Sequence, residues 1–129
     1  MATPFEHRSF AEELSLAQRY YFTTWPNGTS VGTNIVSTNN LGVAMVGNSS
    51  KIVAGGVGFP TTMRANPSIS VYSPTGTANK YYERHGASDF TFNTSGIRTG
   101  QSYAAFNEYD GGANASREGY IHIFCDAEL

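Results

Sequence analysis

Apolar and polar residues follow a helical period only near the start of the chain, over residues 9–24. Four apolar residues there are spaced by four, three and four positions, as in the core of a heptad repeat: Phe10, Leu14, Ala17 and Tyr21. Ser9 and Glu12 match a capping box, in which the serine side chain accepts the backbone N–H of the glutamate. The pattern predicts one short amphipathic helix that ends before Pro26, because proline and the preceding β-branched threonines oppose its continuation.

The four heptad-spaced residues allow two interpretations, because two heptads are too few for a coiled coil that stands alone. In the first interpretation, the helix packs these residues on the sheet of its own chain, as short capped helices usually do. In the second, the residues meet their own copies around the axis of an oligomer. Leu16 and Tyr20 add a second apolar stripe, so both contacts can exist at once.

Beyond residue 30 the pattern changes to short runs with a period of two, which predicts β-strands. The clearest run is 119–129, where Ile121, Ile123 and Cys125 point to one face and His122 to the other. We expect the first face to be buried and His122 to be half-exposed. About seven or eight such runs, separated by connectors rich in Gly, Asn and Ser, predict a mainly β protein with a jelly-roll-like β-sandwich over residues 25–129.

Composition narrows the classes of partner. A chain of 129 residues suits one domain, and only 14% of its residues are charged, which fits a β-protein solvated by hydroxyls and amides. The formal net charge is −2 and no Lys/Arg cluster occurs, so nucleic-acid binding is not expected. No apolar run approaches the ~20 residues of a membrane span, so membrane insertion is not expected. Cys125 is the only cysteine and is predicted to be a small buried side chain.

No catalytic motif stands out in the sequence. The chain lacks a Gly-x-Ser-x-Gly nucleophile elbow and a Gly-rich phosphate loop that opens a helix. Its carboxylates have no spacing that demands a glycosidase pair, and its three histidines share no metal-ligand spacing. We therefore expect no enzyme, no cofactor and no metal site.

Aromatic residues beside polar residues in the predicted loops and strand ends offer a recognition surface instead. Aromatic rings stack on sugar rings, and neighbouring amides, carboxylates and guanidinium groups bind hydroxyls, although the same mixture also serves loops that bind proteins. The candidate receptor-binding residues are Trp25, Asn27, Tyr81, Tyr82, Arg84, Asn107, Tyr109 and Asp110. For Trp25 the alternative is that its ring fills the junction between the helix and the sheet.

Three segments carry a resemblance to a known family. The segment "ATPFEHRSFAEELSLAQRYY" closely resembles one that recurs in tail-fibre and related virion proteins of tailed bacteriophages and prophages. The segments "FPTTMRANPSISVYSPTGT" and "GYIHIFCDAEL" are similar to the C-terminal domains of the same proteins. This chain departs from the family where Ala17 replaces a frequent cysteine and where Leu14–Ser15 replaces a frequent Leu-Ala. The loops between the three segments are unmatched.

The resemblance implies a C-terminal domain that follows another module of a fibre. Residues 1–8 would be a leader from that module, residues 9–24 a junction helix and residues 25–129 the β-sandwich. It implies a homotrimer joined through Phe10, Leu14, Ala17 and Tyr21, made in the bacterial cytoplasm and located in the virion. The expected function is host attachment, by binding a bacterial surface glycan or protein without catalysis. The alternatives are a purely structural trimerisation or capping module and, with less support, a glycan-processing enzyme.

Overall fold

The computed structural model describes residues 9–35, 43–48, 51–53, 55–83, 87–106 and 118–128. Within these ranges the chain forms one α-helix, one short 3-10 helix and ten strands. The elements are α1 (Phe10–Gln18), β1 (Tyr21–Thr23), β2 (Val43–Asn48), β3 (Lys51–Val53), β4 (Gly56–Gly58), β5 (Ser68–Tyr72), β6 (Lys80–Glu83), β7 (Ser88–Thr91), η1 (Thr94–Gly96), β8 (Ile97–Thr99), β9 (Tyr103–Phe106) and β10 (Glu118–Asp126). The prediction of a mainly β protein with one preceding helix is confirmed.

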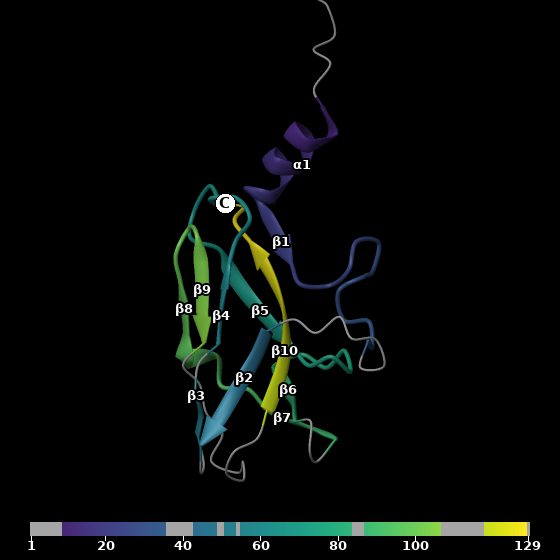
Figure 1. Cartoon of the computed structure of the whole chain (residues 1–129), viewed down its shortest axis with the longest axis vertical. Coiled ribbons are helices and arrows are strands. Elements are labelled where there is room, and N and C mark those ends of the chain that lie inside the picture. Colours follow the sequence, from purple (N-terminus) through teal and green to yellow (C-terminus); the bar gives the residue numbers. More distant parts are fainter. Residues whose placement is uncertain are drawn as a thin grey trace, which may run out of the picture.

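Strand β10 organises the larger of two antiparallel sheets. Its first half pairs with β2 and β6, which continue outward to β3 and β7. Its second half pairs with β1 and β5. A separate three-stranded sheet has the order β4-β9-β8. In Figure 1, α1 extends beyond the sheets at the end of the molecule where β1 begins and β10 ends.

The two sheets share one hydrophobic core, which gives the architecture the character of a β-sandwich. Phe106 of β9 is fully buried and packs edge-on against Phe92, with 6.2 Å between ring centroids. Ile121, Ile123 and Cys125 of β10 are fully buried in the same cluster, as their alternation predicts. Burial also raises the pKa of the Cys125 thiol to about 12, because it disfavours the thiolate.

The helix ends earlier than its sequence pattern predicts. α1 stops at Gln18, and Tyr21 already lies in β1, opposite Asp126 of β10. The assignment of residues 9–24 to the helix is therefore wrong beyond Arg19, which caps it. The physical reason is non-local, since the backbone after Tyr20 forms strand hydrogen bonds with the last strand of the chain instead of helical ones.

The expectation that His122 is half-exposed is wrong. Its side chain is fully buried, although it points away from the isoleucines of β10. It stacks on Trp25, with 4.7 Å between ring centroids and 29° between ring planes. Its Nδ1 lies 2.9 Å from the Thr24 hydroxyl, which also accepts the Ile123 N–H at 2.9 Å. The second face of β10 is thus covered by the segment that follows β1.

Candidate functional site

The start of α1 is fixed by the capping box that the sequence predicts. The Ser9 hydroxyl accepts the Glu12 N–H at 3.3 Å, and the Glu12 carboxylate accepts the Ser9 N–H at 2.8 Å. The Glu12 carboxylate also accepts the Ser9 hydroxyl at 3.0 Å. The hydrogen bonds that this carboxylate accepts from the Ser9 backbone and side chain lower the pKa of Glu12, because they favour its charged form. Glu12 and Glu13 also place negative charge in the first turn, where the helix dipole favours it.

The backbone carbonyls directly after α1 accept hydrogen bonds from two segments that are distant in the sequence. The Arg64 N–H donates to the Arg19 carbonyl at 2.8 Å, and the Ala127 N–H donates to the Tyr20 carbonyl at 2.8 Å. The Arg64 guanidinium also lies over the Tyr20 ring, 5.6 Å from its centroid. The direction in which α1 leaves the β-domain is therefore set by contacts with both the 59–67 connection and the C-terminal strand.

Along its length, however, α1 carries an uncovered apolar surface. No residue of the helix is buried, and the Phe10 side chain is 83% exposed. The large apolar residues of α1 and its junction with β1 that remain exposed are Phe10, Leu14, Leu16, Tyr20 and Tyr21. The first interpretation of the sequence, in which the helix packs its apolar residues on the sheet of its own chain, does not describe this arrangement.

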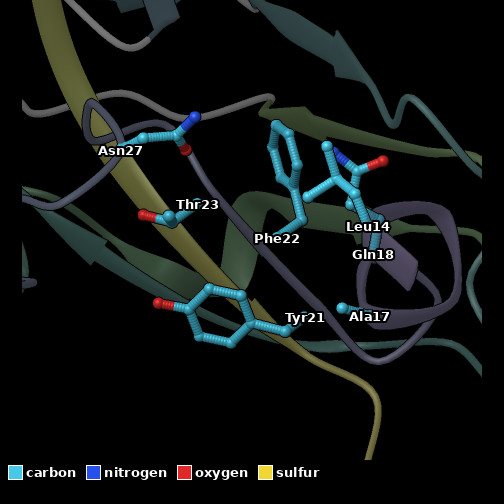
Figure 2. Close-up of a pocket in the computed structure, with 7 residues that line it drawn as sticks. All are labelled: Leu14, Ala17, Gln18, Tyr21, Phe22, Thr23 and Asn27. Atoms are coloured by element: carbon cyan, nitrogen blue, oxygen red, sulfur yellow. The ribbon is translucent and has the colours of Figure 1, made fainter. Parts of the chain in front are cut away.

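A groove of about 180 Å³ lies where α1 meets β1 (Figure 2). One wall comes from the helix and the other from the strand, and Asn27 lies at the far side. The lining residues are Leu14, Ala17, Gln18, Tyr21, Phe22, Thr23 and Asn27. Four of them offer an apolar surface, and the Gln18 amide, Thr23 hydroxyl and Asn27 amide add hydrogen-bonding groups. This set can bind another molecule, but it contains no carboxylate, imidazole or thiol for acid–base or nucleophilic catalysis.

The groove brings together residues that the sequence assigned to two different roles. The interface candidates Leu14, Ala17 and Tyr21 line it together with the receptor candidate Asn27. Phe10 lies outside the groove, at the exposed start of the helix. Gln18, Phe22 and Thr23 were missed by sequence reasoning. Gln18 lies four residues after Leu14 on the same helix, so the helical period contained a signal for it.

Two receptor candidates are buried, so their assignment to a binding surface is wrong. Trp25 is 3% exposed, packs between His122 and Tyr72, and donates its indole N–H to the Thr33 carbonyl at 3.2 Å. It fills the junction after β1, which was the alternative for this residue. Tyr81 is 1% exposed in the core and stacks on Phe90.

The other receptor candidates divide into two groups. Asn27 is exposed and Tyr82 is half-buried on β6. Arg84, Asn107, Tyr109 and Asp110 lie outside the described residues, so their prediction stands untested. The structure does place the adjoining strand ends, because Glu83 of β6 pairs with both Ser88 of β7 and Gly119 of β10. These ends lie at the opposite end of the β-domain from α1 (Figure 1).

A metal centre and a membrane-spanning helix are two other functional features that a chain can carry. Among its residues, no three His, Cys, Asp or Glu side chains gather closely enough to hold a metal ion. None of the helical segments that the structure describes has the length and apolar character needed to cross a bilayer. Comparison of this chain with protein-family models, curated proteins and solved structures found no match.

Proposed function

We propose that this chain is the C-terminal domain of a tail-fibre or related virion protein of a tailed bacteriophage. In this proposal three copies assemble through α1, and their β-domains, folded as jelly-roll-like sandwiches, attach the virion to a bacterial surface glycan or protein. Binding requires no cofactor, no nucleic acid and no membrane insertion, and no catalytic step follows it. The location is the virion, after synthesis in the bacterial cytoplasm.

The observation that carries the proposal is the arrangement of α1. A capped helix with exposed apolar residues leaves one end of a β-domain whose described strands bury a shared core. Such an element suits a junction between a shaft and a terminal domain, because it has a surface for neighbouring chains and fixed contacts to its own sheet. The sequence resemblance supplies the class of protein in which this junction occurs.

The proposed receptor surface is the end of the β-domain opposite α1. The ends of β6, β7 and β10 that meet there adjoin Arg84 and the segment that contains Tyr109 and Asp110 in the sequence. Loops on a rigid sheet tolerate changes that the sheet itself does not, so they suit a specificity-determining role. Three parallel copies would also convert weak single-site binding into strong attachment.

A purely structural trimerisation or capping module is the second candidate. The observation that favours it is the burial of Trp25 and Tyr81, which removes two of the aromatic rings assigned to recognition. Binding of the purified chain to bacteria separates the two candidates, because the structural module binds no cell surface.

Replacing Tyr109 with alanine is expected to weaken attachment at least about tenfold, since losing a central aromatic contact commonly costs about 2 kcal/mol of binding. The measurement is the binding of labelled chain to a panel of bacterial strains and to their extracted surface glycans, together with the melting temperature. Tyr103→Ala is the matched control, because Tyr103 is 52% exposed on β9 and is not a candidate. Equal binding by both variants and the wild type would contradict the assignment of Tyr109. Absence of wild-type binding across the panel would favour the structural module.

A further inference from the structure

We propose that Arg64 and its neighbours, at the end of the β-domain next to α1, form a binding site for an acidic sugar, whose carboxylate pairs with the Arg64 guanidinium group. The site goes beyond the proposed function, because it lies at the opposite end of the β-domain from the proposed receptor loops (Figure 1). It is also separate from the heptad-spaced residues of α1, to which neither Arg64 nor the adjoining Arg19 and Tyr20 belong.

Three segments that are distant in the sequence meet around Arg64. The end of α1 supplies Arg19 and Tyr20, the connection between β4 and β5 supplies Arg64, and the turn between β8 and β9 supplies Gln101. The Met63 N–H joins this connection to the turn by donating to the Gln101 carbonyl at 2.8 Å. In Figure 1 both segments lie just below α1. The fold thus brings together two arginines that form no cluster in the sequence.

Three contacts hold Arg64 in place although its side chain is exposed. Its N–H donates to the Arg19 carbonyl at 2.8 Å, and its carbonyl accepts the Gln101 side-chain amide at 3.2 Å. Its guanidinium group lies over the Tyr20 ring, 5.6 Å from the centroid, where the ring attracts a cation. A side chain that is already ordered loses less conformational entropy when a ligand binds, so Arg64 is preorganised for binding.

The charge around Arg64 favours an anionic ligand. Within the described ranges, neither Arg19 nor Arg64 forms a salt bridge with a carboxylate. Asp126 alternates with the buried Cys125 and Ala127, so its carboxylate lies on the outer face of β10, away from the smaller sheet. Two exposed guanidinium groups without an acidic partner create a local positive potential, in a chain whose formal net charge is −2.

The groups beside the guanidinium select a sugar that carries the anion. A planar guanidinium group donates two parallel hydrogen bonds to one carboxylate. The Tyr20 ring is 39% exposed next to it and offers an apolar surface for the ring of a sugar. The exposed Gln101 amide retains its oxygen as an acceptor, and the exposed Ser102 adds a hydroxyl, so both can bind sugar hydroxyls. A bare inorganic anion would use the guanidinium alone.

The test is the binding of the whole chain to immobilised polygalacturonate, a polymer of an acidic sugar, by surface plasmon resonance. Dextran, a neutral glucose polymer, is the reference surface. The wild type is expected to bind polygalacturonate and not dextran. Arg64→Gln should weaken this binding at least about tenfold, because it removes the charged hydrogen-bond donor but keeps both backbone hydrogen bonds. Arg64→Lys should weaken it less, because lysine keeps the charge and loses only the planar fork.

Arg98→Gln is the matched control, since it changes the net charge equally. Arg98 is exposed on β8, and its guanidinium donates to the Ser95 carbonyl at 3.4 Å. Binding by this variant should stay within about twofold of the wild type, because a general attraction between charged surfaces is the only term it alters. Equal losses in Arg64→Gln and Arg98→Gln would overturn the inference, as would wild-type binding that is no stronger to polygalacturonate than to dextran.

Competition in solution tests the ligand class without any variant, which matters if Arg64→Gln lowers the melting temperature. Sodium galacturonate is expected to displace the wild-type chain from polygalacturonate, whereas inorganic phosphate at the same concentration and ionic strength is not. Equal displacement by phosphate would identify a general anion site and overturn the assignment to a sugar. The mass of the assembly and the effect of Tyr109→Ala on cell binding report on the proposed function separately, so each proposal can fail without the other.

Discussion

Gly76→Ala is expected to destabilise the fold by about 3 kcal/mol or more, a large part of the stability of an ordinary domain. Gly76 has a φ of +95°, a conformation that costs an alanine about 1–2 kcal/mol. A Cβ at this position would also lie well inside van der Waals contact with the backbone carbonyl of Gly32. Because the obstacle is backbone, it cannot rotate away, and the backbone around Gly32 or Gly76 must shift. Denaturant unfolding of the purified variant measures the loss.

Gly28→Ala is the matched control for this prediction. Gly28 has a φ of +83°, but an added Cβ there meets no atom within 4 Å. It should therefore cost only the backbone strain of about 1–2 kcal/mol. Equal losses in the two variants would show that the close approach of Gly32 and Gly76 contributes nothing beyond that strain.

The turn that contains Gly76 was predictable from "SPTG", and the Gly76 N–H donates to the Ser73 carbonyl at 2.9 Å.

The second large effect is expected for His122→Ser, at about 2–4 kcal/mol of unfolding free energy. The change removes a fully buried ring that stacks on Trp25 and pairs with the Thr24 hydroxyl. It leaves a cavity beneath Trp25, at the place where the segment after β1 covers the sheet. A loss within about 1 kcal/mol is the result expected of a half-exposed residue, and it would contradict the packing described above.

Two substitutions at Thr24 separate the hydroxyl from the ring. Thr24→Val removes the oxygen that accepts the Ile123 N–H, so a loss of about 1–3 kcal/mol is expected from the unsatisfied donor. Thr24→Ser keeps that oxygen and should be milder. Thermal or denaturant unfolding of Thr24→Val, Thr24→Ser and His122→Ser measures the unfolding free energy of each variant. The comparison separates the contribution of hydrogen bonding at this junction from that of packing.

The helix shows why local signals were predictable and its end was not. The capping box involves residues three apart, so the sequence contained the whole motif. The end of α1 depends on the pairing of Tyr21–Thr23 with Cys125 and its neighbours, about a hundred positions away. The heptad spacing that included Tyr21 carried no information about the pairing of β1 with β10, which competes with the helix. The same limit left the short strand Ile97–Thr99 unpredicted, since it exists by pairing with β9.

In β10, too, the local pattern predicted one feature correctly, whereas a feature that depends on a distant segment was missed. Alternation correctly predicted that Ile121 and Ile123 are buried, because one face of the sheet covers the core. It failed for His122, because a period of two shows only that the two faces of β10 differ in polarity. It does not show whether another segment of the chain covers the second face. Trp25 covers it, from a segment almost a hundred residues earlier. Tyr81 was missed for a different reason: the sequence interpretation placed it at a loop or strand end, whereas it lies within β6 and packs in the shared core.

The sequence predicted some of the residues that line the candidate site, but not that they meet in one groove. Leu14 and Ala17 follow from the helical period, and Asn27 from the composition of the loop after β1. Their meeting in one groove with Phe22 and Thr23 requires the bend between α1 and β1. That bend is fixed by hydrogen bonds from Arg64 and Ala127, which no local pattern could reveal.

The most direct test of the proposed assembly is the mass of the whole chain by light scattering after size exclusion. The account predicts a mass of about three times the chain mass of 13.9 kDa. Leu14→Asp should reduce it to that of one chain, because a charge buried in an apolar contact is costly, whereas Ser15→Asp on the outer side should leave it unchanged. A wild-type chain that elutes with the mass of a single copy would contradict the claim that α1 joins these domains.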